Sequence, residues 1–262
     1  MTLRTLSSTA AAAVLALGLA ACGSDGGETT DSGAALIKAG TLTVCSDVPY
    51  PPFEDFDKNS ETGFKGFDID IVSEVAERLD LEIEIKDSSF DALQSGLALN
   101  SGQCDLAASA MTINDDRKKN LDFSDGYYDS AQSLLVPAGS KITGIDDLDG
   151  VKVGVQQGTT GKDYAEENAK GAELITFPSD AEMFAAIKAG QVDALLQDLP
   201  VNLDHVKAGG YEIVEEYSTE EEYGLAMKKG NTALVEDVNG ALEEMRDDGA
   251  YDELYDKYFA VK

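Results

Sequence analysis

Two stretches of this 262-residue chain repeat one layout, and the repeat is the strongest constraint on its fold. Residues 97–109 and residues 186–198 each run from a helical pattern through a Gly-Gln turn and an aspartate into a short apolar segment. Such a segment suits a strand that is buried on both faces. Residues 42–47 and residues 151–156 form a second pair of similar segments. We therefore expect two similar α/β halves, with a ligand cleft between them at the carboxyl ends of their strands.

The turn after residues 106–110, the apolar segment of the first half, carries groups that suit an anion. Asn114 can cap a short helix, and free backbone N–H groups where a strand ends and a helix begins hold anions. Arg117 lies one helical turn further on, and its guanidinium can grip a carboxylate through two parallel hydrogen bonds. The alternative interpretation is a buried strand followed by a solvated run of charges.

The first residues have the pattern of an export signal. Arg4 supplies a positive charge, and residues 10–19 form an apolar run that is too short to span a bilayer permanently. The run ends in Leu-Ala-Ala-Cys at Cys22, which looks like a bacterial lipobox; an ordinary signal peptide with a chance cysteine is the alternative. We expect residues 1–21 to be removed and residues 22–35 to form a lipidated, flexible tether. The mature protein would then be anchored at the extracellular face of the cell membrane.

Residues 36–262 are enough for one large domain or two lobes. With 50 acidic against 20 basic residues, the formal charge of −30 argues against nucleic acid as a partner. Such a charge attracts cations, although solubility outside the cell explains it equally well. Cys45 and Cys104 remain besides Cys22, and an even count in an exported chain permits a disulfide; two free buried thiols are the alternative.

Strand and helix patterns alternate along the rest of the chain, which predicts a mostly parallel sheet in each half. Asp68 is expected to cap the first helix. Strands are expected at residues 42–46, 81–86, 106–110, 131–136, 151–155, 173–177, 194–197 and 223–227. Helices are expected after residue 68, at residues 90–99, 160–168 and 181–189, after Pro200, along 235–245 and at 251–259.

Several motifs, taken together, resemble the amino-acid-binding family of bacterial extracellular solute-binding proteins. They are Asp47…Tyr50-Pro51-Pro52-Phe53, Gly66-Phe67-Asp68-Ile69-Asp70, Met111-Thr112-Ile113…Arg117, Phe123-Ser124-Asp125-Gly126-Tyr127-Tyr128, Gln157-Gly158-Thr159 and Gly249-Ala250-Tyr251…Tyr258-Phe259. The resemblance runs from residue 36 to the end. It implies a two-lobed α/β fold of the periplasmic-binding-protein type (type II), joined by a two-stranded hinge. Lobe 1 would comprise residues 36–130 and 224–262, and lobe 2 residues 131–223.

The resemblance also implies a role for each site residue. Arg117 would grip the α-carboxylate of an amino acid, assisted by Thr112 and the Ala110 backbone, while Asp198 would take the α-ammonium group. Tyr50 and Phe90 would sandwich the side chain, with Asp47 near its far end, and Thr159 and Thr160 would lie on the loop of lobe 2. Gly161 stands where many relatives carry a larger polar residue. The predicted ligand contacts are Asp47, Tyr50, Phe90, Ser109, Ala110, Thr112, Arg117, Gln156, Thr159, Thr160 and Asp198.

The expected function is capture of a polar, cationic free amino acid and its delivery to an ABC importer, by a monomer without cofactor or metal. Arginine, lysine and ornithine fit Asp47 and the two aromatic rings. Glutamine is the alternative, because Gln156, Thr159 and Asp47 could satisfy an amide. An amino-acid sensor lipoprotein and a dehydratase of the same fold are further alternatives. An enzyme usually needs a positioned acid or base, and the single histidine, His205, is expected away from the strand ends.

Overall fold

The computed structural model describes residue 30 and residues 33–260. The expected export signal, Cys22 and most of the tether lie outside these residues. The described end of the expected tether is not a free linker, because Ala34 is buried in the core of the first lobe and the Ala35 carbonyl accepts a 3.1 Å hydrogen bond from Asn231. In the described part of the chain, no helix combines the length and the apolar character needed to cross a membrane.

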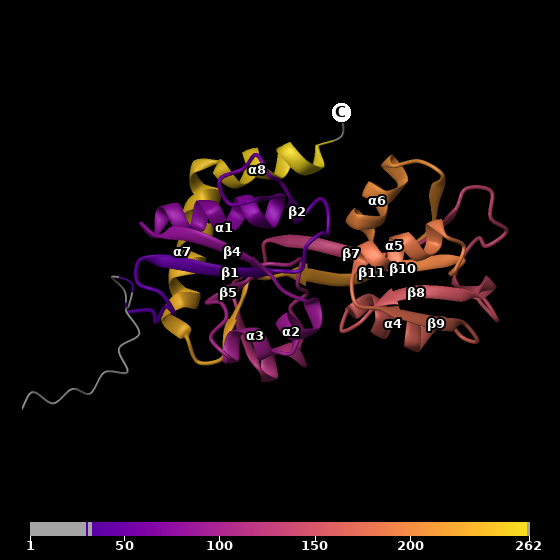
Figure 1. Cartoon of the computed structure of the whole chain (residues 1–262), viewed down its shortest axis with the longest axis horizontal. Coiled ribbons are helices and arrows are strands. Elements are labelled where there is room, and N and C mark those ends of the chain that lie inside the picture. The colour runs from indigo at the N-terminus through magenta and orange to yellow at the C-terminus, as the bar shows by residue number, and fades with distance from the viewer. Residues whose placement is uncertain (1–29, 31–32, 261–262) are drawn as a thin grey trace, which may run out of the picture.

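Two five-stranded sheets, flanked by helices, form two lobes that lie side by side (Figure 1). The predicted two-lobed α/β fold is confirmed. The first sheet has the order β4-β1-β5-β12-β6, and the second has the order β11-β7-β10-β8-β9. The first contains β1 (Thr41–Ser46), β4 (Glu82–Asp87), β5 (Leu106–Ala107), β6 (Leu121–Phe123) and β12 (Ala226–Lys228). The second contains β7 (Tyr128–Pro137), β8 (Lys152–Gln156), β9 (Glu173–Phe177), β10 (Ala194–Asp198) and β11 (Tyr211–Tyr223).

Helices cover both faces of each sheet (Figure 1). On the first sheet, α1 (Phe67–Arg78) buries the predicted stripe of Val72, Val75 and Ala76, and it packs against α7 (Thr232–Asp248) and α8 (Ala250–Phe259). On one face of the second sheet, Ala165 of α4 (Thr160–Asn168) shares a hydrophobic core with Val153 and Val155. The opposite face of this sheet packs in a separate core. The remaining helices are α2 (Phe90–Gln94), α3 (Leu97–Asn100), α5 (Asp180–Lys188) and α6 (Leu199–Lys207). Short elements are the β2 (Asp55–Phe56) and β3 (Phe64–Lys65) hairpin and two 3₁₀ turns, η1 (Arg117–Lys119) and η2 (Ile145–Asp147).

Each sheet is mixed, so the expectation of mostly parallel sheets is only half right. The parallel pairs join β1 to β4 and β5, and β8 to β9 and β10. The antiparallel pairs join β12 to β5 and β6, and β7 to β10 and β11. These antiparallel strands adjoin the points where the chain enters and leaves the second lobe, so the crossings, and not helical connections, set their direction.

Two local predictions for the first lobe are wrong. The single helix expected at residues 90–99 is two short helices, because Gly96 adopts a left-handed conformation with φ of 80°. Asp68 lies inside α1 and does not cap it; its buried carboxylate accepts hydrogen bonds from the Ala110 N–H and from the Tyr127 hydroxyl, both at 2.7 Å. Asp68 thereby holds Ala110 at φ of 44°, a conformation that is strained for alanine.

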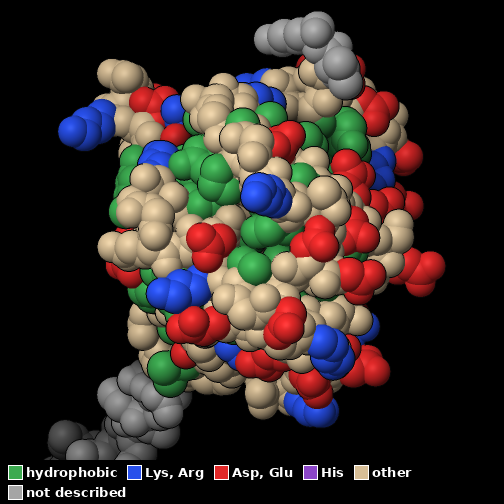
Figure 2. Space-filling view, turned by 90° about the vertical axis from the view of Figure 1, so that its right-hand side faces the viewer, with side chains coloured by type: hydrophobic (Ala, Val, Ile, Leu, Met, Phe, Trp, Pro, Cys, Tyr) green, Lys and Arg blue, Asp and Glu red, His purple; other side chains and the backbone are tan. Residues whose placement is uncertain are grey.

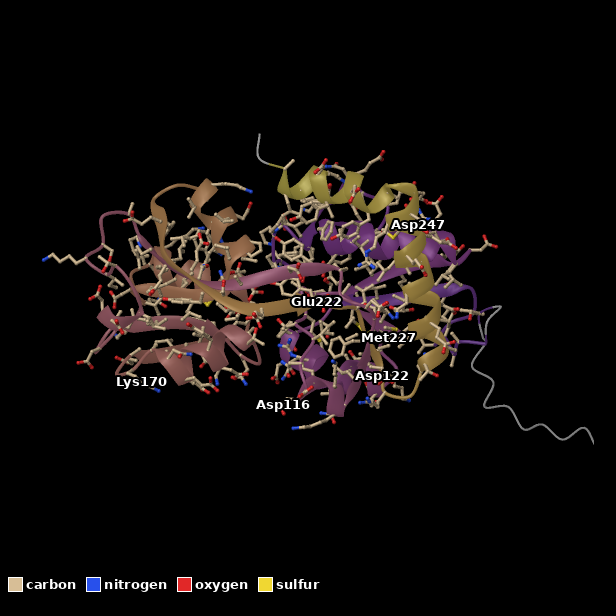
Figure 3. The ribbon with its side chains drawn as sticks, turned by 180° about the vertical axis from the view of Figure 1, so that it is seen from behind. Asp116, Asp122, Lys170, Glu222, Met227 and Asp247 are labelled. Atoms are coloured by element: carbon tan, nitrogen blue, oxygen red, sulfur yellow. A yellow bond between two sulfur atoms is a disulfide. The ribbon has the colours of Figure 1, made fainter. Side chains whose placement is uncertain are left out.

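The strands β7 and β11 pair along the crossing between the lobes, from Tyr211 opposite Pro137 to Tyr223 opposite Tyr128. Figure 3 shows this crossing from behind, with Glu222 on it. Most of β11 was not predicted, because its glutamate-rich sequence lacks the alternation of a half-buried strand. The pairing register shifts between Tyr217 and Glu221, which marks a β-bulge beside the crossing.

The predicted Cys45–Cys104 disulfide is present, with the two Cα atoms 5.8 Å apart. It ties β1 to the turn before β5, and both cysteines are buried. Acidic and basic side chains are both scattered over the end of the second lobe, with the acidic ones more frequent (Figure 2), in line with the strong negative charge of the chain.

Candidate functional site

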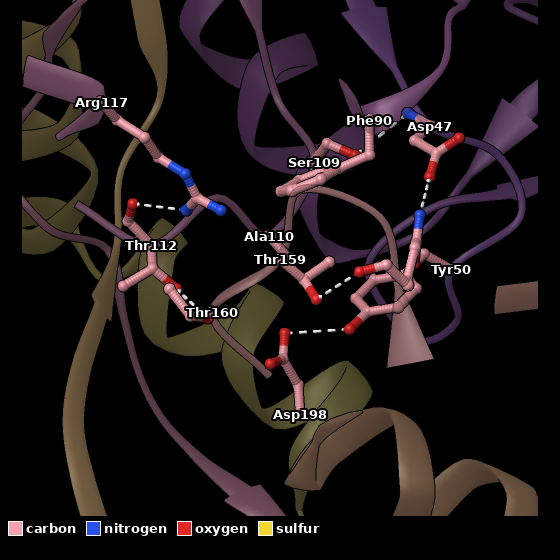
Figure 4. Close-up of a pocket in the computed structure, with 11 residues that line it drawn as sticks. Asp47, Tyr50, Phe90, Ser109, Ala110, Thr112, Arg117, Thr159, Thr160 and Asp198 are labelled. Atoms are coloured by element: carbon pink, nitrogen blue, oxygen red, sulfur yellow. Dashed lines mark hydrogen bonds between the residues drawn. The ribbon is translucent and has the colours of Figure 1, made fainter. Parts of the chain in front are cut away.

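A narrow cavity lies between the two lobes, and all eleven residues predicted as ligand contacts line it (Figure 4). The space within it that is free for a water-sized molecule is about 10 Å³, roughly enough for one water, so the side chains of the two lobes nearly fill the cavity. From the first lobe come the loops after β1 and β5 and the start of α2. From the second come the ends of β8 and β10 and the start of α4. The cavity therefore lies at the carboxyl ends of parallel strands, as the repeat predicts.

Among the residues that the structure describes, Arg117 is the one basic residue that lines the cavity. The helix predicted after Asn114 is only the 3₁₀ turn η1, which has Asp116 at its N-cap position, but the Asn114 side chain does accept a 2.9 Å hydrogen bond from the Arg117 N–H. The guanidinium donates to the Thr112 carbonyl at 2.7 Å and to the Gly158 carbonyl of the other lobe at 3.1 Å. Its carbon lies 5.2 Å from the centre of the Phe90 ring. These bonds go to carbonyl groups and not to a carboxylate, so this buried cation favours an anionic group in the cavity.

Asp198 lies at the end of β10 and is 8% exposed. Its Oδ2 accepts hydrogen bonds from the hydroxyls of Tyr50 at 2.9 Å and Tyr223 at 2.6 Å. Its Oδ1 accepts one from Gln132 Nε2 at 2.6 Å. Burial, followed by the charge of Glu221, raises the pKa of Asp198 to about 6. A cation bound beside Asp198 would favour its ionised form.

Asp47 and Gln156 meet across the cavity from opposite lobes. Gln156 Nε2 donates to the Asp47 carboxylate at 2.7 Å. Burial raises the pKa of Asp47 to about 7, although the bond from Gln156 opposes this rise. The backbone N–H of Asp47 donates to the Ser109 hydroxyl at 3.0 Å, and that hydroxyl donates to the buried Glu54 at 2.6 Å. The hydroxyl proton of Ser109 is thus already committed.

The other lining residues also have local partners. Thr159 caps α4, since its hydroxyl accepts from Lys162 N at 3.1 Å, and it donates to the Gln156 carbonyl at 2.9 Å. The N–H of Ala110 is taken by Asp68, which leaves its carbonyl oxygen as the group it can offer to a ligand. The hydroxyls of Thr112 and Thr160 both donate to Glu221, at 2.6 and 2.7 Å. Thr112 was expected to assist Arg117 in binding the α-carboxylate, but its hydroxyl proton is bonded to Glu221 and is not free to be donated to that group.

Sequence reasoning missed Glu221 and Gln132, which adjoin the lining residues. Glu221 lies in a run of three glutamates that looks like a solvated edge, and Gln132 lies between Ser130 and Ser133 in the polar first half of β7. Neither position carries a local pattern that sets it apart from its polar neighbours. Gln132 also explains Gly161, because a Cβ atom at Gly161 would lie 2.6 Å from Gln132 Oε1. A larger residue there would require the Gln132 side chain to move.

His205 lies outside the cavity, as expected. It is buried on α6, where its ring stacks on Phe184 with 3.7 Å between centres and its Nε2 lies 2.9 Å from Asp180. In the described residues, no group of three or more His, Cys, Asp or Glu side chains is placed to hold a metal ion.

Comparison with known proteins gives consistent matches over nearly all of the chain. The profile of the bacterial extracellular solute-binding proteins, family 3, matches residues 42–261. A protein of Neisseria gonorrhoeae named "Probable histidine-binding protein" is 37% identical over 261 residues, which cover 96% of this chain and 94% of that protein. The ABC transporter glutamine-binding protein of Bacillus subtilis (strain 168) is 38% identical over 207 residues, 77% of this chain and 75% of its own. A solved structure entitled "An ancestral arginine-binding protein bound to glutamine" is 40% identical, with a TM-score of 0.80, and the match covers 86% of this chain and all of the other.

Proposed function

The chain belongs to family 3 of the bacterial extracellular solute-binding proteins, and we propose that it captures a free amino acid with a cationic side chain for an ABC importer. The relatives cited above are all named for binding an amino acid, and the Bacillus subtilis protein is named as part of an ABC transporter. The observation that carries the finer proposal is the arrangement of charges in the cavity. One buried arginine, Arg117, is set against two buried carboxylates, Asp198 and Asp47.

The main-chain end of the ligand would lie between Arg117 and Asp198. Arg117 belongs to the first lobe and Asp198 to the second, so a zwitterion would join the lobes by its two charges. A ligand that contacts both lobes binds best when they are closed on it, and its binding energy shifts the population to that state. We propose lobes of residues 36–130 with 224–262 and of residues 131–223, which close about β7 and β11.

The side chain of the ligand would extend toward Asp47. The rings of Tyr50 and Phe90 line the path, and such faces suit an alkyl chain that ends in a cation. An acidic side chain would face Asp47 without a partner, which is costly in a buried site. Arginine, lysine and ornithine therefore fit best.

Glutamine is the second candidate, and the hydrogen bond between Gln156 and Asp47 favours it. These two side chains offer an amide and a carboxylate at the far end, the donor and acceptor groups that a ligand amide needs. One of the similar proteins is named for binding glutamine, which supports this candidate, and another is named for binding histidine.

A thermal-shift screen of the twenty common amino acids and ornithine tests the proposal. A ligand at 100 times its dissociation constant adds about 2.7 kcal/mol to the stability of the folded state. We expect arginine, lysine or ornithine to give the largest rise in the melting temperature. A rise with glutamine alone selects the second candidate. Stabilisation by glutamate or aspartate without any of these ligands would overturn the proposal.

We also propose that Cys22 carries a lipid that anchors the protein to the extracellular face of the membrane. The support is the lipobox pattern and the tether that follows it. Metabolic labelling with a fatty-acid analogue should label the wild-type protein and not Cys22→Ala. Equal labelling of both would refute the anchor.

A further inference from the structure

We propose that Glu221 is a positioning residue of the binding site, which makes Thr112 and Thr160 hydrogen-bond acceptors and so selects ligands that carry an α-ammonium group. The inference rests on the proposed function, that the cavity holds a free amino acid.

A β-bulge aims Glu221 at the cavity. Tyr217 pairs with Gln132, but Glu221 pairs with Ser130, so β11 holds extra residues at this place. Within the bulge, Glu220 adopts a φ of 51°. Bulges re-aim side chains next to functional sites. Here the bulge buries the Glu221 side chain, which is 7% exposed, while its neighbours Glu220 and Glu222 are exposed.

One carboxylate oxygen of Glu221 accepts hydrogen bonds from both lobes. Its Oε2 accepts from Thr112 of the first lobe at 2.6 Å and from Thr160 of the second lobe at 2.7 Å. A hydroxyl has a single proton, and an ionised carboxylate can only accept. Since both protons point to Glu221, the lone pairs of the two threonine oxygens are what remains for the ligand. Both threonines line the cavity, whereas Glu221 does not.

Gln132 connects Glu221 to Asp198. Its Nε2 donates to Glu221 Oε1 at 2.9 Å and to Asp198 Oδ1 at 2.6 Å. This corner of the cavity therefore offers the two threonine oxygens and the Asp198 carboxylate as acceptors, while the nearby donors are occupied. An ammonium group has three donors and no acceptor, so it matches this corner, and a methylene group at the same place would leave the acceptors unpaired.

The test measures how strongly the protein prefers an α-amino group. The probes are L-arginine and 5-guanidinopentanoic acid, which is arginine without its α-amino group, and as a second pair L-glutamine and its desamino analogue. Calorimetry gives, for each pair, the ratio of the dissociation constant of the desamino compound to that of the amino acid, and a high ratio means a strong preference for the α-amino group. The variants are Glu221→Gln, which removes the charge, and Glu221→Asp, which keeps the charge but withdraws the oxygens. Glu222→Gln is the matched control, because it removes an equal charge from an exposed neighbour on the same strand.

We expect both Glu221 variants to lower the ratio at least about tenfold, equivalent to about 1.4 kcal/mol, and the control to leave it unchanged. A purely structural role would weaken both probes equally and leave the ratio intact, which would overturn the inference. A ratio that falls in Glu221→Gln but not in Glu221→Asp would also overturn it, because charge alone would then suffice. If Glu221→Gln fails to fold, Glu221→Asp still decides the question. If neither amino acid binds the wild-type protein, the proposed function itself fails, which is a separate result.

Discussion

The Tyr50 hydroxyl donates a 2.9 Å hydrogen bond to the Asp198 carboxylate from the opposite lobe. The bond crosses the cavity, as do those from Gln156 to Asp47 and from Arg117 to the Gly158 carbonyl. The groups that would recognise the ligand are thus also groups through which the lobes touch. A substitution among them is expected to change both ligand affinity and lobe closure.

Replacing Asp198 by asparagine should weaken amino-acid binding at least about 30-fold. The change removes the buried charge that faces the α-ammonium group, and loss of one partner in such a contact costs about 2–5 kcal/mol. Calorimetry with L-arginine measures the effect, and Asp193→Asn is the control, since Asp193 is exposed and lies just before β10. Near-native affinity in Asp198→Asn would contradict the assignment.

Arg117→Ala should weaken binding by a similar factor, because the α-carboxylate would lose its buried cation. Arg117→Lys should recover only part of the loss, since an ammonium group cannot make two parallel hydrogen bonds to a carboxylate. The neighbouring Lys118→Ala is the control, because Lys118 is exposed. The same calorimetric titration applies, and full affinity in Arg117→Lys would show that charge alone suffices.

Affinity for a cationic amino acid should fall as the pH is lowered below about 7. Burial raises the pKa of Asp47 to about 7 and that of Asp198 to about 6, so both carboxyls take up protons in this range when the site is empty. A cationic ligand favours the ionised forms and must displace those protons, which costs at most about tenfold in affinity per pH unit and group. In Asp47→Asn the fall should begin nearer pH 6.

The stability of the ligand-free protein should change with pH in the opposite direction. A carboxyl whose pKa is raised by folding contributes stability that is present below its unfolded pKa of 3.8 and is lost as the pH rises through its folded value. Urea unfolding at pH 5 and pH 8, beside arginine titrations at each pH, checks both trends. A flat affinity between pH 8 and pH 5 would contradict the role of the two carboxyls.

Removing the disulfide by Cys45→Ala with Cys104→Ala should lower the free energy of unfolding by about 4 kcal/mol. The bond closes a loop with a sequence separation of 59, which restricts the unfolded chain. The midpoint of urea unfolding measures this, with the wild-type protein under reducing conditions as a second arm. Unchanged midpoints in both would mean that the bond adds nothing to stability.

Gly66→Ala should destabilise the protein by more than about 2 kcal/mol, whereas Gly240→Ala should be neutral or stabilising. A Cβ atom at Gly66 would lie 2.0 Å from the Phe53 carbonyl oxygen, and its φ of 133° strains any other residue. Gly240 lies within α7 with nothing within 4 Å of its Cβ position, so the helical preference of alanine decides there. Thermal unfolding of the two variants makes a direct comparison.

The cavity residues could be predicted because they follow strands or begin helices, where local patterns and family motifs are informative. Glu221 could not, since its burial depends on a bulge in β11 and on contacts with residues far away in the chain. The break at Gly96 and the buried role of Asp68 likewise depend on tertiary contacts, which a helical pattern does not show.

The position of β12 sets an order for assembly of the chain. β12 lies between β5 and β6, yet it is made after every strand of the second sheet. The second sheet, from β7 to β11, is continuous in sequence and can pair completely while the first still lacks a central strand. Because a chain is synthesised from its N-terminus, the second lobe can therefore fold before the first lobe. The first lobe is complete only when the C-terminal segment with β12 has been made.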